Sequence, residues 1–117
     1  RISHTQGDDR RLRRYYENAE IFVYPSRYEG FGIPPLEAMS AGCPVVAAYS
    51  SSIPEVCGEG ACYFDPNDAS SLRSRLETLM SDNNARAALI AAGTSRLAAF
   101  SWRKCAEDTL AEYRKLL

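Results

Sequence analysis

Two glutamates, Glu29 and Glu37, flank a short glycine-containing stretch and are separated by seven residues. Gly30 and Gly32 follow the first of them, and glycine lets a backbone come close to a ligand. A carboxylate has two acceptor oxygens, so each glutamate can accept hydrogen bonds from two neighbouring hydroxyls of a sugar ring. The free N–H groups at a helix start attract phosphate, and the helix dipole adds about half a positive charge there. The stretch therefore combines acceptors for hydroxyls with donors for phosphate.

The order of these groups along the chain narrows the class of ligand. Pro34 and Pro35 have no N–H, so the expected phosphate donors are the backbone amides from Gly30 to Ile33. A carboxylate repels a phosphate, which argues against a general anion site. A sugar nucleotide presents a diol, a diphosphate and a second diol, which matches the order carboxylate, amide loop, carboxylate. A structural interpretation stays open, in which Glu29 is a loop charge and Glu37 is stabilised by the helix dipole.

Alternating strand and helix signals surround this stretch. Residues 21–24, 44–48 and 61–64 are short apolar runs bounded by turn residues, and each predicts a buried strand. The loop 26–33 leaves the first strand, and a helix then begins at Pro34 and ends at Gly42, a left-handed cap. The predicted fold class is α/β, a partial doubly wound (Rossmann-like) parallel sheet with helices on both faces. Ligands bind beyond the carboxyl ends of such strands, where this loop lies.

Four further helices are predicted from apolar spacing and caps. Asp8 or Asp9 caps the first, Asp68 the second and Ser101 the last, while Gly93 allows close packing in the third. A single turn is expected around residues 53–56. The residues that share a predicted helix face, in chain order, are Leu12, Tyr15, Tyr16 and Ala19; Leu72, Leu76, Leu79 and Met80; Leu89, Gly93, Leu97 and Phe100; and, on an inner side, Trp102, Ala106, Leu110, Tyr113 and Leu117.

Composition sets the broad class of protein. A chain of 117 residues, 45% hydrophobic and 25% charged, is typical of one soluble globular domain. The net charge of -1 gives no reason to expect nucleic acid as a partner. No apolar run reaches the roughly 18 residues of a membrane span. Four arginines, Arg10, Arg11, Arg13 and Arg14, lie in the first predicted helix. They are interpreted as a solvated face, with a lipid- or phosphate-binding patch as the alternative.

The cysteines and the single histidine do not predict a metal site. The four cysteines form no C-x-x-C pair, and His4 is the only histidine. Neither a metal nor a cofactor is therefore expected. Small apolar residues flank most of these thiols and favour buried, reduced cysteines in a cytosolic protein, with disulfides as the alternative. The cysteines are Cys43, Cys57, Cys62 and Cys105. Because Arg1 has no preceding Met and leads almost directly into a helix, the chain is interpreted as a piece of a longer polypeptide.

An extended string of residues around the glutamate pair resembles a known family. Residues 25–39, followed by residues 42–47, are similar to the signature of family 4 retaining glycosyltransferases (glycosyl transferases group 1), and Glu29 and Glu37 match its E-x7-E motif. Residues 52–56, 64–66 and 100–102 look like later landmarks of the same family. The resemblance implies that residues 1–117 are a single partial domain. It would be the latter part of the C-terminal, donor-binding domain of a GT-B enzyme, without its first strands or its N-terminal acceptor domain.

The resemblance also implies an activity and a role for each matched residue. Such enzymes transfer a sugar from a nucleoside diphosphate donor with retention at the anomeric carbon, without a metal held by an Asp-x-Asp motif. Glu29 would be the catalytic residue, acting as a nucleophile or, as we favour, by stabilising oxocarbenium-like charge. The residues implied in donor binding are Glu29 at the sugar; Gly30, Phe31, Gly32 and Ile33 at the diphosphate and sugar; Leu36 at the ribose or base; and Glu37 at the ribose hydroxyls.

The chain departs from the family pattern in two respects. An upstream Arg and Lys pair that neutralises the diphosphate is not present, and the arginines of residues 10–14 are not assigned to that role. The acceptor domain is also missing. We therefore expect the 117 residues alone to be inactive and to bind a donor weakly at best. The parent enzyme is expected in the cytoplasm, with peripheral association at the inner face of a membrane left open.

Two other functions compete with transfer. One is a GT-B sugar-nucleotide epimerase or glycan phosphorylase, and the other is a catalytically silent binding module that keeps the fold. The nucleotide base, the sugar, the acceptor and the oligomeric state are not specified by these residues.

Overall fold

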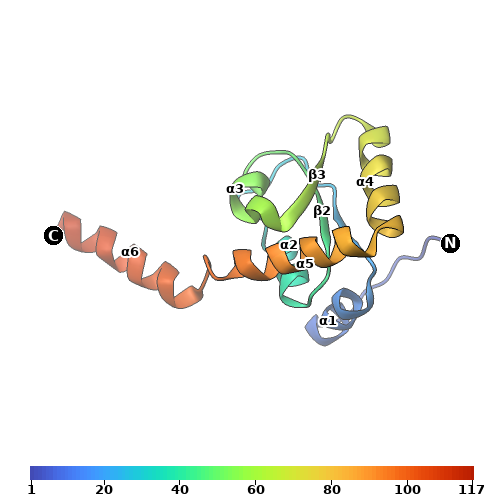
Figure 1. Ribbon diagram of the computed structural model, residues 1–117. Coiled ribbons are helices and arrows are strands. Elements are labelled where there is room, and N and C mark those ends of the chain that lie inside the picture. Colours follow the sequence, from blue (N-terminus) through green and yellow to red (C-terminus); the bar gives the residue numbers. More distant parts are fainter.

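A three-stranded parallel sheet lies at the centre of the computed structural model, which describes residues 1–117 (Figure 1). The strands are β1 (Phe22–Tyr24), β2 (Val45–Ala48) and β3 (Ala61–Phe64), in the spatial order β1-β2-β3. In the register, Val46 of β2 pairs with Val23 on one side and Cys62 on the other. All three predicted strands are present, and the middle one is fully buried.

The helices follow the predicted order, and three of their caps are the predicted ones. They are α1 (Asp9–Asn18), α2 (Ile33–Ser40), α3 (Ile53–Cys57), the 3-10 turn η1 (Gly58–Gly60), α4 (Ala69–Ser81), α5 (Asn83–Leu97) and α6 (Trp102–Leu116). The side chains of Asp8, Asp68 and Ser101 each accept a hydrogen bond from a first-turn amide. Gly42, just after α2, has a φ of 74°, as expected for a left-handed cap.

The core forms on both faces of the sheet, because successive residues of β2 point to opposite sides. Val45 and Ala47 belong to a cluster with residues of α1, α2 and α3. Val46 and Ala48 belong to a second cluster, against which α4 and the first half of α5 pack. Helices therefore cover both faces, which confirms the doubly wound α/β prediction.

Helix α5 passes close to the sheet edge through two glycines. A Cβ on Gly60 would lie 3.0 Å from the Cα of Gly93, and a Cβ on Gly93 would lie 3.0 Å from Cγ of Met39. The buried Met39 side chain fills the space beside them. The predicted close packing at Gly93 is thus confirmed, and its partner is the 3-10 turn before β3.

Helix α6 corrects one prediction. Its apolar residues were expected on an inner side, but none of its residues is buried, and Trp102 is 82% exposed. The helix extends away from the body of the molecule, with the C-terminus at its far end (Figure 1). A spacing of 3.6 residues predicts an apolar helix face but does not show which surface covers that face, and no other part of this chain covers the apolar face of α6. Met80 of α4 is a smaller correction: it is 65% exposed, because Leu72, Leu76 and Leu79 alone face the core.

The remaining side-chain predictions divide by element. Cys43 and Cys57 are buried free thiols, as predicted, and Cys62 is half-buried. Cys105 is exposed because it lies on α6, so the prediction of burial was wrong there. The four arginines of α1 are all exposed, which agrees with a solvated face. No helix combines the length and apolar character needed to cross a membrane.

Candidate functional site

The loop between β1 and α2 is held by a row of serines that follows β2. The Ser52 hydroxyl donates to the carbonyls of Glu29 (2.9 Å) and Phe31 (3.1 Å), and the Glu29 amide donates to Ser51 Oγ (2.9 Å). The Ser50 hydroxyl donates to the carbonyl of Arg27. Both segments leave the carboxyl ends of neighbouring parallel strands, where ligand sites of such sheets form. The three serines therefore hold the backbone of residues 27–31, which includes Glu29, by hydrogen bonds.

Ser51 itself is held in an unusual conformation. Its φ is 48°, in the left-handed region that residues with a side chain seldom occupy. In this conformation its Oγ accepts the hydrogen bond from the Glu29 amide. Backbone outliers of this kind often lie at ligand sites. The sequence alone predicted no role for Ser50, Ser51 and Ser52. Three consecutive hydroxyl residues after the neighbouring strand were the signal that could have predicted hydrogen bonds to the glycine loop.

The Glu29 carboxylate is held on one oxygen by two hydroxyls. Tyr24 Oη donates to Glu29 Oε1 at 2.6 Å, and Ser26 Oγ donates to the same atom at 2.7 Å. These bonds, first that of Tyr24 and then that of Ser26, lower the pKa of Glu29 below the usual value of a glutamate. Burial, and then the bond to Glu29, raises the pKa of Tyr24 to about 12. Near neutral pH the pair is therefore a carboxylate and a phenol.

The backbone amides of the glycine-containing part of the loop, residues 30–33, have no acceptor within the chain. The N–H groups of Gly30, Phe31 and Gly32 donate no hydrogen bond in the chain, and Ile33 opens α2, where an N–H has no partner within the helix. Gly32 is the N-cap residue of α2, with φ 100° and ψ 64°, and is buried. Gly30 is exposed and surrounded by open space. The loop presents the predicted row of donors at a helix N-terminus.

Phe31 connects this loop to the segment before α6. Its ring meets the ring of Phe100 edge to face, with centroids 5.6 Å apart. The Arg96 guanidinium lies 5.0 Å from the Phe100 centroid and donates to the carbonyl of Val56 (2.8 Å). Phe100 was predicted to share a helix face with Leu97, but α5 ends at Leu97 and Phe100 follows outside the helix. Phe100 is half-buried and contacts the glycine loop through the Phe31 ring.

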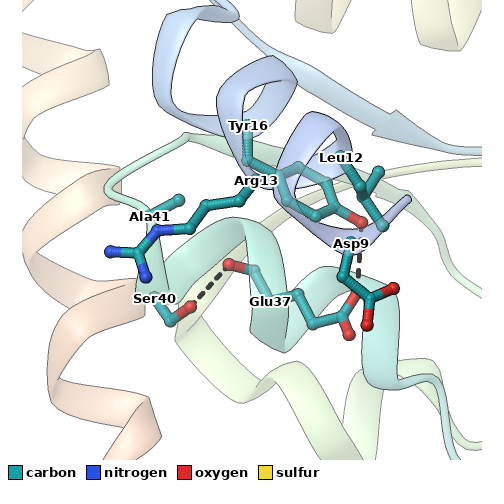
Figure 2. Close-up of a pocket in the computed structure, with 7 residues that line it drawn as sticks. All are labelled: Asp9, Leu12, Arg13, Tyr16, Glu37, Ser40 and Ala41. Atoms are coloured by element: carbon teal, nitrogen blue, oxygen red, sulfur yellow. Dashed lines mark hydrogen bonds between the residues drawn. The ribbon is translucent and has the colours of Figure 1, made fainter. Parts of the chain in front are cut away.

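Glu37 lies in a separate pocket of about 300 Å³ between α1 and α2 (Figure 2). Tyr16 Oη donates to Glu37 Oε2 at 3.3 Å. Burial, and then the charge of Glu37, raises the pKa of Tyr16 to about 12. The only cationic side chain in the lining, Arg13, is paired with Glu17 at 2.7 Å. The lining residues are Asp9, Leu12, Arg13, Tyr16, Glu37, Ser40 and Ala41.

The predicted site residues thus form two neighbouring groups. Glu29 and the amide loop share the serine-clamped edge of the sheet, whereas Glu37 faces α1 from the exposed side of α2. Leu36 is half-buried and packs against the core cluster below the helix, so its contact with a ribose or base stays a prediction. No cluster of three or more His, Cys, Asp or Glu residues is arranged to hold a metal ion.

Comparisons with known proteins point to one family. A family model described as "Glycosyl transferases group 1" matches residues 2–96. The O-antigen chain mannosyltransferase B of Escherichia coli is 41% identical over 108 residues, which cover 92% of this chain and 28% of that protein. The MMP alpha-(1->4)-mannosyltransferase of Mycolicibacterium hassiacum is 35% identical over 99% of this chain and 30% of its own length. The chain therefore spans under a third of these relatives.

Solved structures agree with these sequence matches. A sucrose-phosphate synthase from Thermosynechococcus elongatus superposes with a TM-score of 0.82 and 32% identity, over 95% of this chain and 29% of that one. The C-terminal domain of a glycosyl transferase group 1 family protein (LpcC) from Francisella tularensis superposes with a TM-score of 0.72 and 27% identity. That match covers 83% of this chain and 51% of the other.

Proposed function

The chain belongs to the glycosyl transferases group 1 family, and we propose that it forms the donor-binding part of an enzyme that transfers a sugar from a nucleoside diphosphate sugar. Its α/β fold is that of the C-terminal domain of a GT-B glycosyltransferase, as predicted. The observation that carries the proposal is the row of unpaired amides from Gly30 to Ile33, which follows the Glu29 carboxylate directly. Glu37 lies in a separate pocket between α1 and α2.

The diphosphate would bind at the amide row. Free N–H groups at the start of α2 and the positive end of its dipole both favour a negative charge there. Pro34 and Pro35 contribute no donor, so the site is confined to residues 30–33. The left-handed Gly32 turns the backbone so that the row and the helix start meet.

The nucleoside end would bind at Glu37. Its pocket is lined by two carboxylates, Asp9 and Glu37, and the guanidinium of Arg13 is already paired with Glu17. Such a lining repels phosphate and favours a group that donates hydrogen bonds. A ribose diol does so, and Glu37 has two oxygens to accept from it. This assignment of Glu37 to the ribose follows the E-x7-E motif.

Glu29 would act at the transferred sugar. In a transfer with retention, positive charge develops at the anomeric carbon as the diphosphate leaves, and a fixed carboxylate stabilises that charge. The hydrogen bonds from Tyr24 and Ser26 lower the pKa of Glu29 and so favour the ionised form that this role needs. We propose electrostatic stabilisation and positioning by Glu29, with the acceptor entering on the face that the diphosphate vacates.

The relatives suggest a hexosyl donor. Several of them are named mannosyltransferases, including proteins of Escherichia coli and Mycolicibacterium hassiacum. A nucleoside diphosphate mannose is therefore the first donor to test. No metal or cofactor is part of the proposal. The acceptor domain, the cations that neutralise the diphosphate, the cytoplasmic location and a peripheral membrane contact would belong to the full-length protein, and the 117 residues alone are proposed to be inactive.

Charge-neutral variants of the two glutamates in a full-length protein that carries this chain test the proposal. Glu29→Gln is expected to lower kcat about 100-fold or more, because it removes a preorganised charge at the reacting centre. Glu37→Gln is expected to raise the donor KM with a smaller effect on kcat. Glu59→Gln is the matched control, since Glu59 is exposed on η1 and makes no ion pair. A transfer rate near wild type for Glu29→Gln would remove the catalytic role of Glu29.

A further inference from the structure

The two oxygens of the Glu29 carboxylate are not equivalent. Oε1 accepts from both Tyr24 Oη (2.6 Å) and Ser26 Oγ (2.7 Å), whereas Oε2 accepts no hydrogen bond within the chain. A carboxylate oxygen has about two acceptor positions, so the two hydroxyls fill those of Oε1. Hydrogen bonds to an ionised group are also among the stronger ones in proteins. Any ligand hydroxyl at Glu29 therefore meets Oε2.

The donors are themselves fixed by the fold. Tyr24 ends β1, where its ring stacks against Phe22 with centroids 5.9 Å apart and packs on the core cluster. Ser26 follows two residues later, and its hydroxyl oxygen lies 2.7 Å from Glu29 Oε1 and 3.3 Å from the Tyr28 carbonyl oxygen. The shorter distance and the charge of the carboxylate favour Glu29 as the acceptor. The backbone of Glu29 is held separately by Ser51 and Ser52. Both ends of the glutamate are thus constrained by different elements.

From this geometry, and resting on the proposed function, we propose that Tyr24 and Ser26 are positioning residues that orient Glu29 so that Oε2 alone faces the donor sugar. They act through Glu29 and do not touch the ligand themselves. A carboxylate held this way stays in one rotamer when the sugar binds, and a preorganised group needs no rearrangement during the reaction. Tyr24 and Ser26 would therefore affect the rate of transfer more than the affinity for the donor.

The alternative is that the Tyr24–Glu29 bond only closes the loop between residues 24 and 29. The two roles differ in what they change. A loop closure affects the stability of the fold alone, whereas a positioning role also sets the rate of transfer. Under either role the two bonds lower the pKa of Glu29, so a change in that pKa reports that the bonds exist, and the rate of transfer distinguishes the roles.

The first measurement is a pH titration of the Glu29 side-chain carboxyl by carbon NMR in the 117-residue chain. Tyr24→Phe and Ser26→Ala each remove one hydroxyl with little change in volume, and each is expected to raise the pKa of Glu29. Tyr63→Phe is the matched control, because Tyr63 Oη donates to the Gly58 carbonyl at 2.6 Å, away from Glu29. The control should leave the Glu29 midpoint unchanged. Unchanged midpoints in both variants would overturn the proposal.

The second measurement is the pH profile of transfer in a full-length protein that carries this chain. Tyr24→Phe and Ser26→Ala should lower kcat by about tenfold to a hundredfold, as misplacement of a catalytic group does. They should leave the donor KM nearly unchanged and move the acid limb of kcat to higher pH. Ser26→Thr, which keeps a hydroxyl, should restore much of the rate, and Tyr63→Phe should match wild type.

Glu29→Gln separates failure of this proposal from failure of the proposed function. If Glu29→Gln keeps the wild-type rate, the catalytic role of Glu29 is lost and Tyr24 and Ser26 have nothing to position. If Glu29→Gln is slow while Tyr24→Phe and Ser26→Ala keep both the wild-type kcat and its acid limb, only the positioning proposal is wrong. Thermal unfolding of each variant identifies misfolding, and Ser26→Ala decides the question if Tyr24→Phe does not fold.

Discussion

The two glycines of the loop should respond very differently to alanine. Gly32 has φ 100° and ψ 64°, and the nearest atom to an added Cβ is Ile53 Cγ1 at 4.0 Å. There is room for a methyl group, so the cost of Gly32→Ala comes from the backbone alone. Gly30 has no positive φ, and nothing lies within 4 Å of its added Cβ. Gly30→Ala is therefore a matched control in the same loop.

The magnitude follows from these conformations. A residue with a Cβ costs roughly 1–2 kcal/mol in the left-handed region. Alanine also reduces the entropy of the unfolded chain, which stabilises a compatible site by about 0.4–1 kcal/mol. We therefore expect Gly32→Ala to lower the free energy of unfolding by about 1 kcal/mol, and Gly30→Ala to leave it unchanged or raise it by about 0.5 kcal/mol.

Urea unfolding of the 117-residue chain gives both values, provided that the m-values stay equal. Amide chemical shifts of residues 30–33 then report whether Gly32→Ala relieves its strain by turning the amide row. Equal free energies of unfolding for the two variants, with an unchanged amide row, would refute the view that Gly32 is required for its backbone conformation.

Three further outcomes are expected. Gly60→Ala should lower the free energy of unfolding by about 1–3 kcal/mol, because its Cβ would stand 3.0 Å from backbone of α5. Gly93→Ala should have a similar cost, because its Cβ would stand 3.0 Å from Cγ of the buried Met39, near the base of that side chain, and urea unfolding measures both variants. The pKa values of Tyr16, Tyr24 and Tyr63 are raised to about 12, so the stability that their neutral forms contribute is fully present below pH 10. The free energy of unfolding should therefore fall as pH rises from 10 to about 12, as followed by tyrosine absorbance and circular dichroism. Fluorescence of Trp102, the only tryptophan, should be quenched by acrylamide as readily in the folded as in the unfolded chain, unless α6 is covered.

Much of the fold could be predicted because local signals and tertiary packing agree. Asp8, Asp68 and Ser101 cap helices at positions where a polar side chain precedes an apolar helix face. Gly42 follows the end of α2, where the backbone adopts a left-handed conformation. The face of α6 could not be placed. Its apolar residues are spaced as regularly as those of α4. Regular spacing predicts that one face is apolar, but it does not predict which surface packs against that face.

The site divides in a similar way. The free amides of the loop could be predicted, because glycines between a strand and a helix start leave backbone N–H groups without partners. The roles of Glu29 and Glu37 stay predictions. The contacts of Tyr24 and Ser26 with Glu29 could not be predicted, because a tyrosine at the end of a strand is equally compatible with a place in the core. Its hydroxyl finds a partner only when the loop brings Glu29 back toward β1. The pocket around Glu37 likewise depends on the approach of α1, which no residue pattern in α2 indicates.

An amide chemical-shift titration of the chain with UDP and GDP at millimolar concentration shows whether residues 29–37 bind a nucleoside diphosphate sugar. We expect the perturbations to be concentrated in residues 26–37, led by the amides of Gly30, Phe31 and Gly32, with a second group at Glu37 and Tyr16. Perturbations confined to residues outside 26–37 would contradict the account.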